Sequence, residues 1–357
     1  MIAERIVAVQ SSLAGLAIDA LLVSAGSDLP YLTGYRAMPL ERITALVVPA
    51  VGDPVLFVPE LEAPRVETTV EVHGWGETDD PIGRIAARLP ADGTIAVGDQ
   101  MWAMFLIAFQ ERLPRARFVD AAPVLAPLRI IKDDDEMEAL RKAARAADTV
   151  ADQLGDVRFS GRTERDLARE IGERLIAEGH DSVSFAIVAS GPNGASPHHE
   201  PGGRVIGDGD AVVADFGGRV RGYGSDTTRM YVVGSPPNGF ADAYAVLEAA
   251  QDAAVRAVAP GATAESIDAA ARRVIAEAGY GDFFIHRTGH GIGLDAHEPP
   301  YIIEGNTEPV APGMTFSIEP GIYVPGQWGM RIEDIVVVTG SGVDRLNRSS
   351  RKVRVVE

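Results

Sequence analysis

The chain has 357 residues, which is long for a single hydrophobic core, so we expect two domains. Lys and Arg number 33 against 51 Asp and Glu, and the resulting net charge of -18 disfavours nucleic acid and anionic membranes as partners. Cysteine is absent, which excludes disulfides and thiolate metal ligands, so any metal must be held by oxygen and imidazole.

The N-terminal stretch does not have the pattern of a targeting segment. Glu4 and Arg5 stand where a signal peptide needs an uninterrupted apolar run. No apolar stretch reaches the length of a membrane span. We therefore expect a soluble cytoplasmic protein.

The first third of the sequence alternates helical and strand patterns, separated by Gly, Pro and Asp turns. A helical pattern over residues 4–16 comes first. Strand patterns follow over 20–24, 45–49, 54–59 and 94–98. This alternation predicts an α/β domain over residues 1–127, followed by a second domain over 128–357.

The second domain combines helical patterns with strands joined by turns. Its first helix begins after Asp133 to Asp135, which offer an N-terminal cap and favourable charge. Further helical patterns cover 163–179, 241–258 and 264–278. Strand patterns cover 184–190, 211–217, 229–234, 314–320 and 331–339. This predicts an α+β domain with mainly antiparallel strands.

A basic cluster lies at the C-terminus. Since runs of charge are usually solvated faces, we expect a solvated terminal strand and not a binding patch. The cluster comprises Arg345, Arg348, Arg351, Lys352 and Arg354.

Four carboxylates interrupt or follow apolar strand patterns of the second domain. They are Asp215, Asp226, Glu319 and Glu333. Each one alone is more often a turn former or a hydrogen-bonded residue than a ligand. Together they would repel one another in a core, and metal ions are the simplest remedy. Two ions can share bridging carboxylates and activate one water.

The sequence offers an imidazole to complete such a site. His290 is flanked by Gly289 and Gly291, which allow the backbone to approach the site closely. His297 lies on the opposite face if the stretch is extended, whereas a turn between the two histidines would bring both to one cleft. Carboxylates with imidazole suit Mn²⁺, Co²⁺, Fe²⁺ or Zn²⁺.

Four segments occur in a characteristic order: DFGGRVRGYGSDTTR, HRTGHGIGLDAHE, SIEPGIY and RIEDIVVVT. The set resembles the pita-bread metallopeptidases, the family of methionine aminopeptidase, aminopeptidase P and prolidase. It is most similar to the branch of Xaa-Pro dipeptidase (prolidase) and aminopeptidase P. The resemblance implies an α+β pita-bread catalytic domain, preceded by a smaller α/β creatinase-like N-terminal domain.

The resemblance also implies the ligands of two divalent metal ions, with Mn²⁺ first and Co²⁺, Zn²⁺ or Fe²⁺ as alternatives. Asp215 would bind one metal, Asp226 and Glu333 would bridge both, and His290 and Glu319 would complete the second. Hydrolysis of Xaa-Pro peptide bonds by a bridging hydroxide is the implied reaction. A homodimer is the implied assembly.

Further residues take roles from the same resemblance. Glu319 would shuttle a proton, while His297 and His198 would donate hydrogen bonds, with His199 as the alternative to His198. Arg331 and Thr228 would hold the bridging carboxylates. The other two residues of interest are His286, expected to be structural, and Tyr223, for which a site role and a structural role are both open.

The expected substrate is a small peptide with proline in the second position, and Xaa-Pro dipeptidase is the first interpretation. Tyr301 stands where many prolidases have an arginine thought to meet the substrate carboxylate, so longer substrates of an Xaa-Pro aminopeptidase stay open. An ectoine-type amidohydrolase would keep the same ligands. A metal-free creatinase-like enzyme and a non-catalytic binding module of this fold are disfavoured, because all five ligands are retained.

Overall fold

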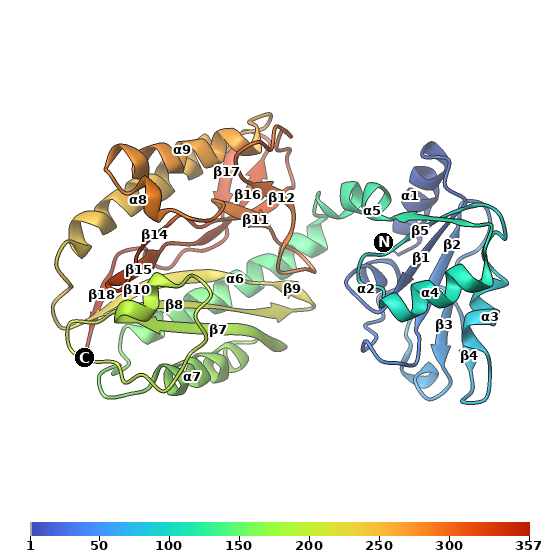
Figure 1. Ribbon diagram of the computed structural model, residues 1–357, viewed down its shortest axis with the longest axis horizontal. Helices are drawn as coiled ribbons and strands as arrows, with labels where there is room; N and C mark the ends of the chain where they lie inside the picture. The colour runs from blue at the N-terminus through green and yellow to red at the C-terminus, as the bar shows by residue number, and fades with distance from the viewer. Residues whose placement is uncertain (1) are drawn as a thin grey trace. The chain divides into compact units, whose positions relative to one another are not determined.

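Two compact units make up the computed structural model, which describes residues 2–357 and divides between Arg129 and Ile130 (Figure 1). We had placed the division after residue 127. Within residues 2–357, no helix is both long enough and apolar enough to span a membrane.

The N-terminal unit is built on a mixed sheet. Its strands are β1 (Ala20–Ser24), β2 (Ala45–Pro49), β3 (Val55–Pro59), β4 (Glu71–Trp75), β5 (Thr94–Val97) and β6 (Arg117–Asp120). They lie in the order β4-β3-β2-β1-β5-β6. The helices are α1 (Ile2–Gly15), α2 (Asp28–Thr33), α3 (Pro81–Ala86), α4 (Ala103–Arg112) and α5 (Ala122–Arg129). Leu22, Phe57 and Phe109 are among the buried side chains of its core.

The strand patterns of this unit are confirmed at β1, β2, β3 and β5. The patterns missed β4 and β6. Most side chains of these two strands are exposed or half-buried. Such strands lack the apolar signal on which sequence recognition depends.

The helical patterns of the C-terminal unit are confirmed as well. Asp133 caps the first helix: its carboxylate accepts from the Glu136 amide at 2.9 Å, and Glu136 accepts from the Asp133 amide at 2.9 Å. Thr163 caps the second, accepting from the Asp166 amide at 3.1 Å. The helices are α6 (Asp134–Leu154), α7 (Glu164–Ala177), α8 (Phe240–Ala257) and α9 (Ala264–Glu277).

The strands of this unit are mainly antiparallel, as expected. They are β7 (Ser182–Ser190), β8 (Ala211–Val220), β9 (Tyr223–Gly224), β10 (Thr227–Val233), β11 (Gly289–Gly291), β12 (Glu298–Ile302), β13 (Thr315–Ile318), β14 (Gly321–Val324), β15 (Trp328–Arg331), β16 (Asp334–Thr339), β17 (Gly342–Arg345) and β18 (Arg354–Val356). One sheet has the order β18-β10-β8-β7 and another β12-β11-β13-β16-β17. In Figure 1, α8 and α9 lie on one side of the strands and α7 lies on the other. Separate apolar cores fill the two sides.

One predicted strand is wrong in its extent. The pattern over 331–339 indicated a single strand, but β15 ends at Arg331 and β16 begins at Asp334. β15 pairs with β14, whereas β16 pairs with β13 and β17. Glu333 therefore lies at the break between two pairings, where its amide donates to the Thr228 carbonyl at 3.3 Å instead of to a strand of either sheet.

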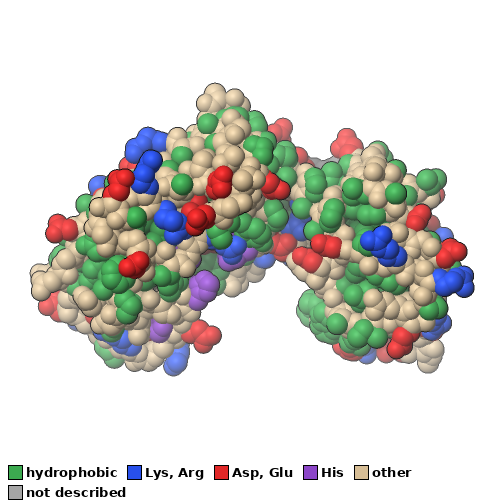
Figure 2. Space-filling model, turned by 45° about the horizontal axis from the view of Figure 1, so that its top comes forward, with side chains coloured by type: hydrophobic (Ala, Val, Ile, Leu, Met, Phe, Trp, Pro, Cys, Tyr) green, Lys and Arg blue, Asp and Glu red, His purple; other side chains and the backbone are tan. Residues whose placement is uncertain are grey.

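The basic tail is not one strand: Arg345 ends β17, Arg354 begins β18, and the other three basic residues lie between the two strands. β18 pairs parallel with β10. Arg351 Nη1 lies 2.6 Å from Asp252 Oδ1, and Lys352 Nζ lies 2.8 Å from Glu248 Oε2. Basic and acidic side chains are interspersed on the face drawn in Figure 2. Acidic partners on α8 therefore neutralise this part of the tail.

Candidate metal centre and its cavity

Side chains from separate strands and loops of the C-terminal unit line one cavity of about 380 Å³. Strand pairing produces this convergence, since Asp215 of β8 lies opposite Thr228 of β10 and His290 projects from β11. The expected metal ligands and the expected catalytic residues all line the cavity: His198, Asp215, Asp226, His290, His297, Glu319, Arg331 and Glu333.

The carboxylates form overlapping groups with the spacing of metal ligands. Oxygens of Asp215, Asp226 and Glu333 lie within 4.8 Å of one another. Donor atoms of His290, Glu319 and Glu333 also lie within 4.8 Å of one another. Glu333 belongs to both groups, which is the arrangement that a bridging ligand requires.

Two carboxylate oxygens of this cluster have no partner. Among the described residues, Asp215 Oδ1, Glu333 Oε1 and Trp328 Nε1 are the buried side-chain atoms without a hydrogen bond. An unpaired buried carboxylate oxygen is costly, and native structures leave few of them unsatisfied. Both oxygens lie in the cluster and both could bind a cation, so the residues present fit a metal site.

The electrostatics of the cluster point to the same conclusion. Burial, followed by repulsion from Asp215 and Glu319, raises the pKa of Asp226 well above its ordinary value. Burial and then repulsion from Asp226 raise the pKa of Glu333 in the same way. The pKa of Glu319 is raised mainly by burial. A bound cation would oppose these shifts, because its positive charge favours the ionised forms of the carboxylates.

His290 reaches the cluster because its strand lies unusually close to its neighbours. A Cβ at Gly289 would lie 1.8 Å from the Ser317 carbonyl oxygen, and one at Gly291 would lie 2.2 Å from the Pro299 carbonyl oxygen. Only glycine permits this approach. The His290 amide donates to Ser317 Oγ at 3.0 Å, and its Nε2 lies 3.3 Å from Glu319 Oε1.

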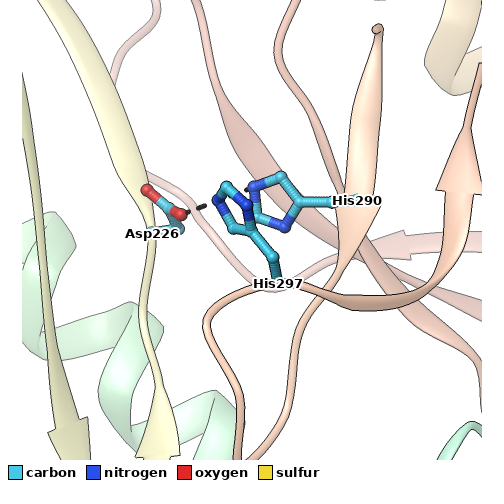
Figure 3. Close-up of side chains that lie close together, drawn as sticks. All are labelled: Asp226, His290 and His297. Atoms are coloured by element: carbon cyan, nitrogen blue, oxygen red, sulfur yellow. Dashed lines mark ion pairs between the residues drawn. The ribbon is translucent and has the colours of Figure 1, made fainter. Parts of the chain in front are cut away.

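His297 shares the cleft with His290 because the chain turns between them. The ring centroids lie 3.8 Å apart. Asp226 joins both histidines in a further group whose donor atoms lie within 4.8 Å of one another, and Figure 3 shows its carboxylate directed toward the two rings. Of the two arrangements that the sequence left open, the turn is therefore the one formed.

Arg331 and Thr228 connect the carboxylates to the surrounding strands. Thr228 Oγ1 donates to Glu333 Oε2 at 2.8 Å and accepts from Arg331 Nε at 3.0 Å. Arg331 Nη2 donates to Asp215 Oδ2 at 2.5 Å. These buried bonds fix the orientation of two carboxylates, as groups behind metal ligands commonly do.

Sequence reasoning missed Tyr323, and it predicted a structural role for His286. Arg331 Nη1 donates to the Tyr323 hydroxyl at 2.8 Å, and His286 Nε2 lies 2.8 Å from the same oxygen. His286 also lines the cavity. The signal for Tyr323 was present, because this residue closes the segment SIEPGIY.

His198 and His199 are adjacent in the chain, but their side chains point different ways. His198 lines the cavity, whereas His199 Nε2 lies 2.8 Å from Glu164 Oε2. Tyr223 is directed elsewhere, since its hydroxyl donates to Glu136 Oε1 at 2.8 Å. Because it lines the cavity, His198 is favoured over His199 as the imidazole that faces the substrate. The contact of Tyr223 is structural.

The rest of the cavity is apolar except for one further cation. Its apolar side chains are Phe185, Ile187, Pro197, Ala296 and Ile303. Arg287 also lines the cavity, and its guanidinium lies 4.6 Å from the ring centroid of Tyr301. Arg287 thus places a positive charge beside Tyr301, the position at which many prolidases have an arginine.

Comparisons with known proteins agree with this architecture. Residues 138–340 match Metallopeptidase family M24, and residues 5–131 match the Creatinase/Prolidase N-terminal domain. The chain is 46% identical over 367 residues to a probable dipeptidase PepE of Mycobacterium tuberculosis, covering 99% of this chain and 96% of that protein. It is 37% identical over 350 residues to an Xaa-Pro dipeptidase of Lactobacillus helveticus, covering 95% of each. The crystal structure of a prolidase from Thermococcus sibiricus superposes with a TM-score of 0.96 at 38% identity, covering 99% of this chain and 98% of that one.

Proposed function

Because this chain belongs to metallopeptidase family M24, we propose that it is a dinuclear Xaa-Pro dipeptidase. The predicted fold class is confirmed: a smaller α/β creatinase-like domain precedes a pita-bread catalytic domain. Relatives named dipeptidase and Xaa-Pro dipeptidase support the substrate class.

The observation that carries the proposal is the unpaired pair of buried oxygens, Asp215 Oδ1 and Glu333 Oε1. They lie in a cluster whose two overlapping groups share Glu333. One cation would need the donor atoms of only one group. Two cations, one in each group, would share the carboxylate of Glu333. The donor set of oxygen and imidazole suits Mn²⁺ first, with Co²⁺, Zn²⁺ or Fe²⁺ as alternatives.

We assign the ligands as the sequence analysis expected. Asp215 would hold one cation, His290 and Glu319 would hold the other, and Asp226 and Glu333 would supply oxygens to both. When bound, the cations lower the pKa of a coordinated water and polarise the scissile carbonyl. Arg331 and Thr228 keep two of these carboxylates in place through the hydrogen bonds described above.

Glu319 is the proposed proton shuttle. Its Oε1 accepts a hydrogen bond from Ser317 Oγ at 3.1 Å, which fixes the carboxyl group beside His290. Glu319 would take the proton of the attacking water and deliver it to the leaving proline nitrogen.

His198 and His297 are the proposed donors to the substrate. Both line the cavity, and burial lowers the pKa of His297 to about 4, so its ring is neutral at pH 7 and retains one N–H. Such a donor stabilises the negative charge that develops on the carbonyl oxygen.

The apolar wall of the cavity fits a proline ring. The positive charge of Arg287 favours a short substrate. Phe185 and Ile303 offer shape without requiring the amide N–H that an Xaa-Pro bond lacks. The guanidinium of Arg287 supports recognition of the free carboxylate of a dipeptide. Xaa-Pro aminopeptidase activity on longer peptides and ectoine-type amidohydrolase activity are the alternatives, because both would keep the same ligands.

The test is release of proline from Ala-Pro and of alanine from Ala-Pro-Pro. The protein is stripped with a chelator and reloaded with Mn²⁺, Co²⁺ or Zn²⁺. Metal-dependent cleavage of the dipeptide alone supports the proposal, and preference for the tripeptide moves the assignment to the aminopeptidase. Two bound metals without cleavage of either peptide would direct attention to non-peptide amides such as ectoine.

We also propose that the enzyme is a cytoplasmic homodimer, as the family resemblance implies. Sedimentation velocity at working concentration tests the assembly. A monomer at that concentration contradicts it.

A further inference from the structure

Glu164, the first residue of α7, is fully buried but lies outside the cavity lining. Its carboxylate is surrounded by donors from one segment, residues 190–202. Oε1 accepts from the Ser190 amide at 2.8 Å and from Ser190 Oγ at 2.7 Å. Oε2 lies 2.8 Å from His199 Nε2 and accepts from the Gly202 amide at 3.3 Å. Asn193 Nδ2 donates to both oxygens, at 3.0 and 3.2 Å.

These bonds hold the beginning, middle and end of the segment that carries His198. The segment begins with a short 3-10 helix, η2 (Gly191–Ala195), which packs against β15, where Gly194 approaches Gly329. Beyond η2 the chain has neither helix nor strand until it has passed Gly202. Besides the bond from the Arg165 amide to the Gly202 carbonyl at 3.1 Å, the position of this second part depends on the Glu164 carboxylate, which binds His199 and Gly202.

The Glu164 carboxylate can affect His198 through its neighbour in the chain, His199. His199 points inward to Glu164, while His198 lines the cavity and is itself largely exposed. An exposed imidazole has few contacts to fix it, so its direction follows from the backbone on either side. Fixing His199 and Gly202 fixes that backbone.

The carboxylate is held in its charged form for this task. Burial alone would raise the pKa of Glu164, but the hydrogen bonds from Ser190, His199 and Asn193 hold that pKa below its ordinary value. A charged acceptor strengthens each of these bonds relative to a neutral one.

We propose that Glu164 is a positioning residue that acts through His198, by anchoring segment 190–202 so that the His198 imidazole faces the substrate. This inference rests on the proposed function for its kinetic readout only. Glu164 would touch neither substrate nor metal, so its removal should reduce kcat and leave the metal content at two per chain.

The test is a double-mutant cycle with Glu164→Gln and His198→Ala, measured on Ala-Pro with the metal-loaded full chain. We expect Glu164→Gln to lower kcat about 10- to 100-fold in the wild type, since misplacement by an ångström has effects of this size. In the His198→Ala background the same change should alter kcat less than about twofold. Equal losses in both backgrounds, or wild-type kcat in Glu164→Gln, would overturn the proposal. Glu170→Gln, on the same helix and paired with Arg174, is the control.

A second readout does not depend on activity. The ¹³C-labelled His198 ring signal, assigned through His198→Ala, should shift or broaden in Glu164→Gln and stay unchanged in Glu170→Gln. An unmoved signal overturns the proposal. If wild-type protein fails to cleave Ala-Pro while this signal moves, the proposed function fails and the positioning role stands. If Glu164→Gln does not fold, His199→Ala removes one anchoring bond and should produce the same signal change with a smaller loss of kcat.

Discussion

The imidazole rings of His290 and His297 lie 3.8 Å apart, at an interplanar angle of 35°. Burial lowers the pKa of His290 to about 4, and burial together with the charge of a protonated His290 lowers the pKa of His297 to about 4. Two rings this close cannot both be charged at little cost, so each stays neutral at pH 7. Metal ligation requires a ring nitrogen without a proton, and the other nitrogen of a neutral ring can still donate a hydrogen bond.

The first prediction separates the roles of these two rings. His297→Ala should keep two metals per chain but lose about 100- to 1000-fold in kcat, because a donor to the developing negative charge is gone. Metal content and steady-state kinetics on Ala-Pro provide the measurement. Unchanged turnover would remove His297 from the site, and loss of a metal would make it a ligand. His73→Ala, in the other unit, serves as the control.

The second prediction concerns the bridging carboxylates. Asp226→Ala and Glu333→Ala should each abolish hydrolysis and metal binding together, because each residue belongs to two groups of donor atoms. Metal content by mass spectrometry after dialysis is the measurement. Either variant retaining two metals per chain would refute the bridging assignment. Glu308→Gln, at an exposed position, is a suitable control.

The third prediction follows from the raised pKa of Glu333 in metal-free protein, a shift caused first by burial. Below the ordinary pKa of 4.5 both folded and unfolded chains keep this proton, so its stabilising contribution is complete there. As pH rises, the unfolded chain loses the proton first and the contribution disappears. A tenfold difference in proton affinity corresponds to about 1.4 kcal/mol.

Glu333→Gln should therefore make metal-free protein more stable than the metal-free wild type at pH 8, and this advantage should vanish near pH 4. Urea unfolding in chelator at several pH values measures it. A pH-independent difference would contradict the raised pKa. By the same logic, metal binding should release protons and weaken as the pH falls.

The fourth prediction concerns the close approach of β11 to β13. Gly289→Ala should displace His290, since the new Cβ would lie 1.8 Å from the Ser317 carbonyl oxygen. We expect the metal held by His290 to be lost and kcat to fall more than about 100-fold. Metal content and kinetics measure this effect. Gly203→Ala is the control, because a Cβ at Gly203 would meet open space and the variant should behave as wild type. If Gly289→Ala retained two metals per chain, the backbone of β11 would be able to shift without displacing His290.

By itself, the sequence determined the features that depend on near neighbours along the chain. The cap at Asp133 and the apolar periods of α6 and β8 are local signals, and they predicted these elements correctly. The order of Asp215, Asp226, His290, Glu319 and Glu333 was enough to identify the family, because spacing along the chain is itself the motif.

Only the tertiary structure decided how the separate stretches meet. The break at Glu333 depends on the pairing of β16 with β13 and β17, and the contact of Tyr323 with Arg331 depends on the hairpin of β14 and β15. Glu164 looked like an ordinary first-turn residue of a helix, since negative charge favours that end of any helix. Its partners are 26 to 38 residues away, and folding alone brings them to its buried carboxylate.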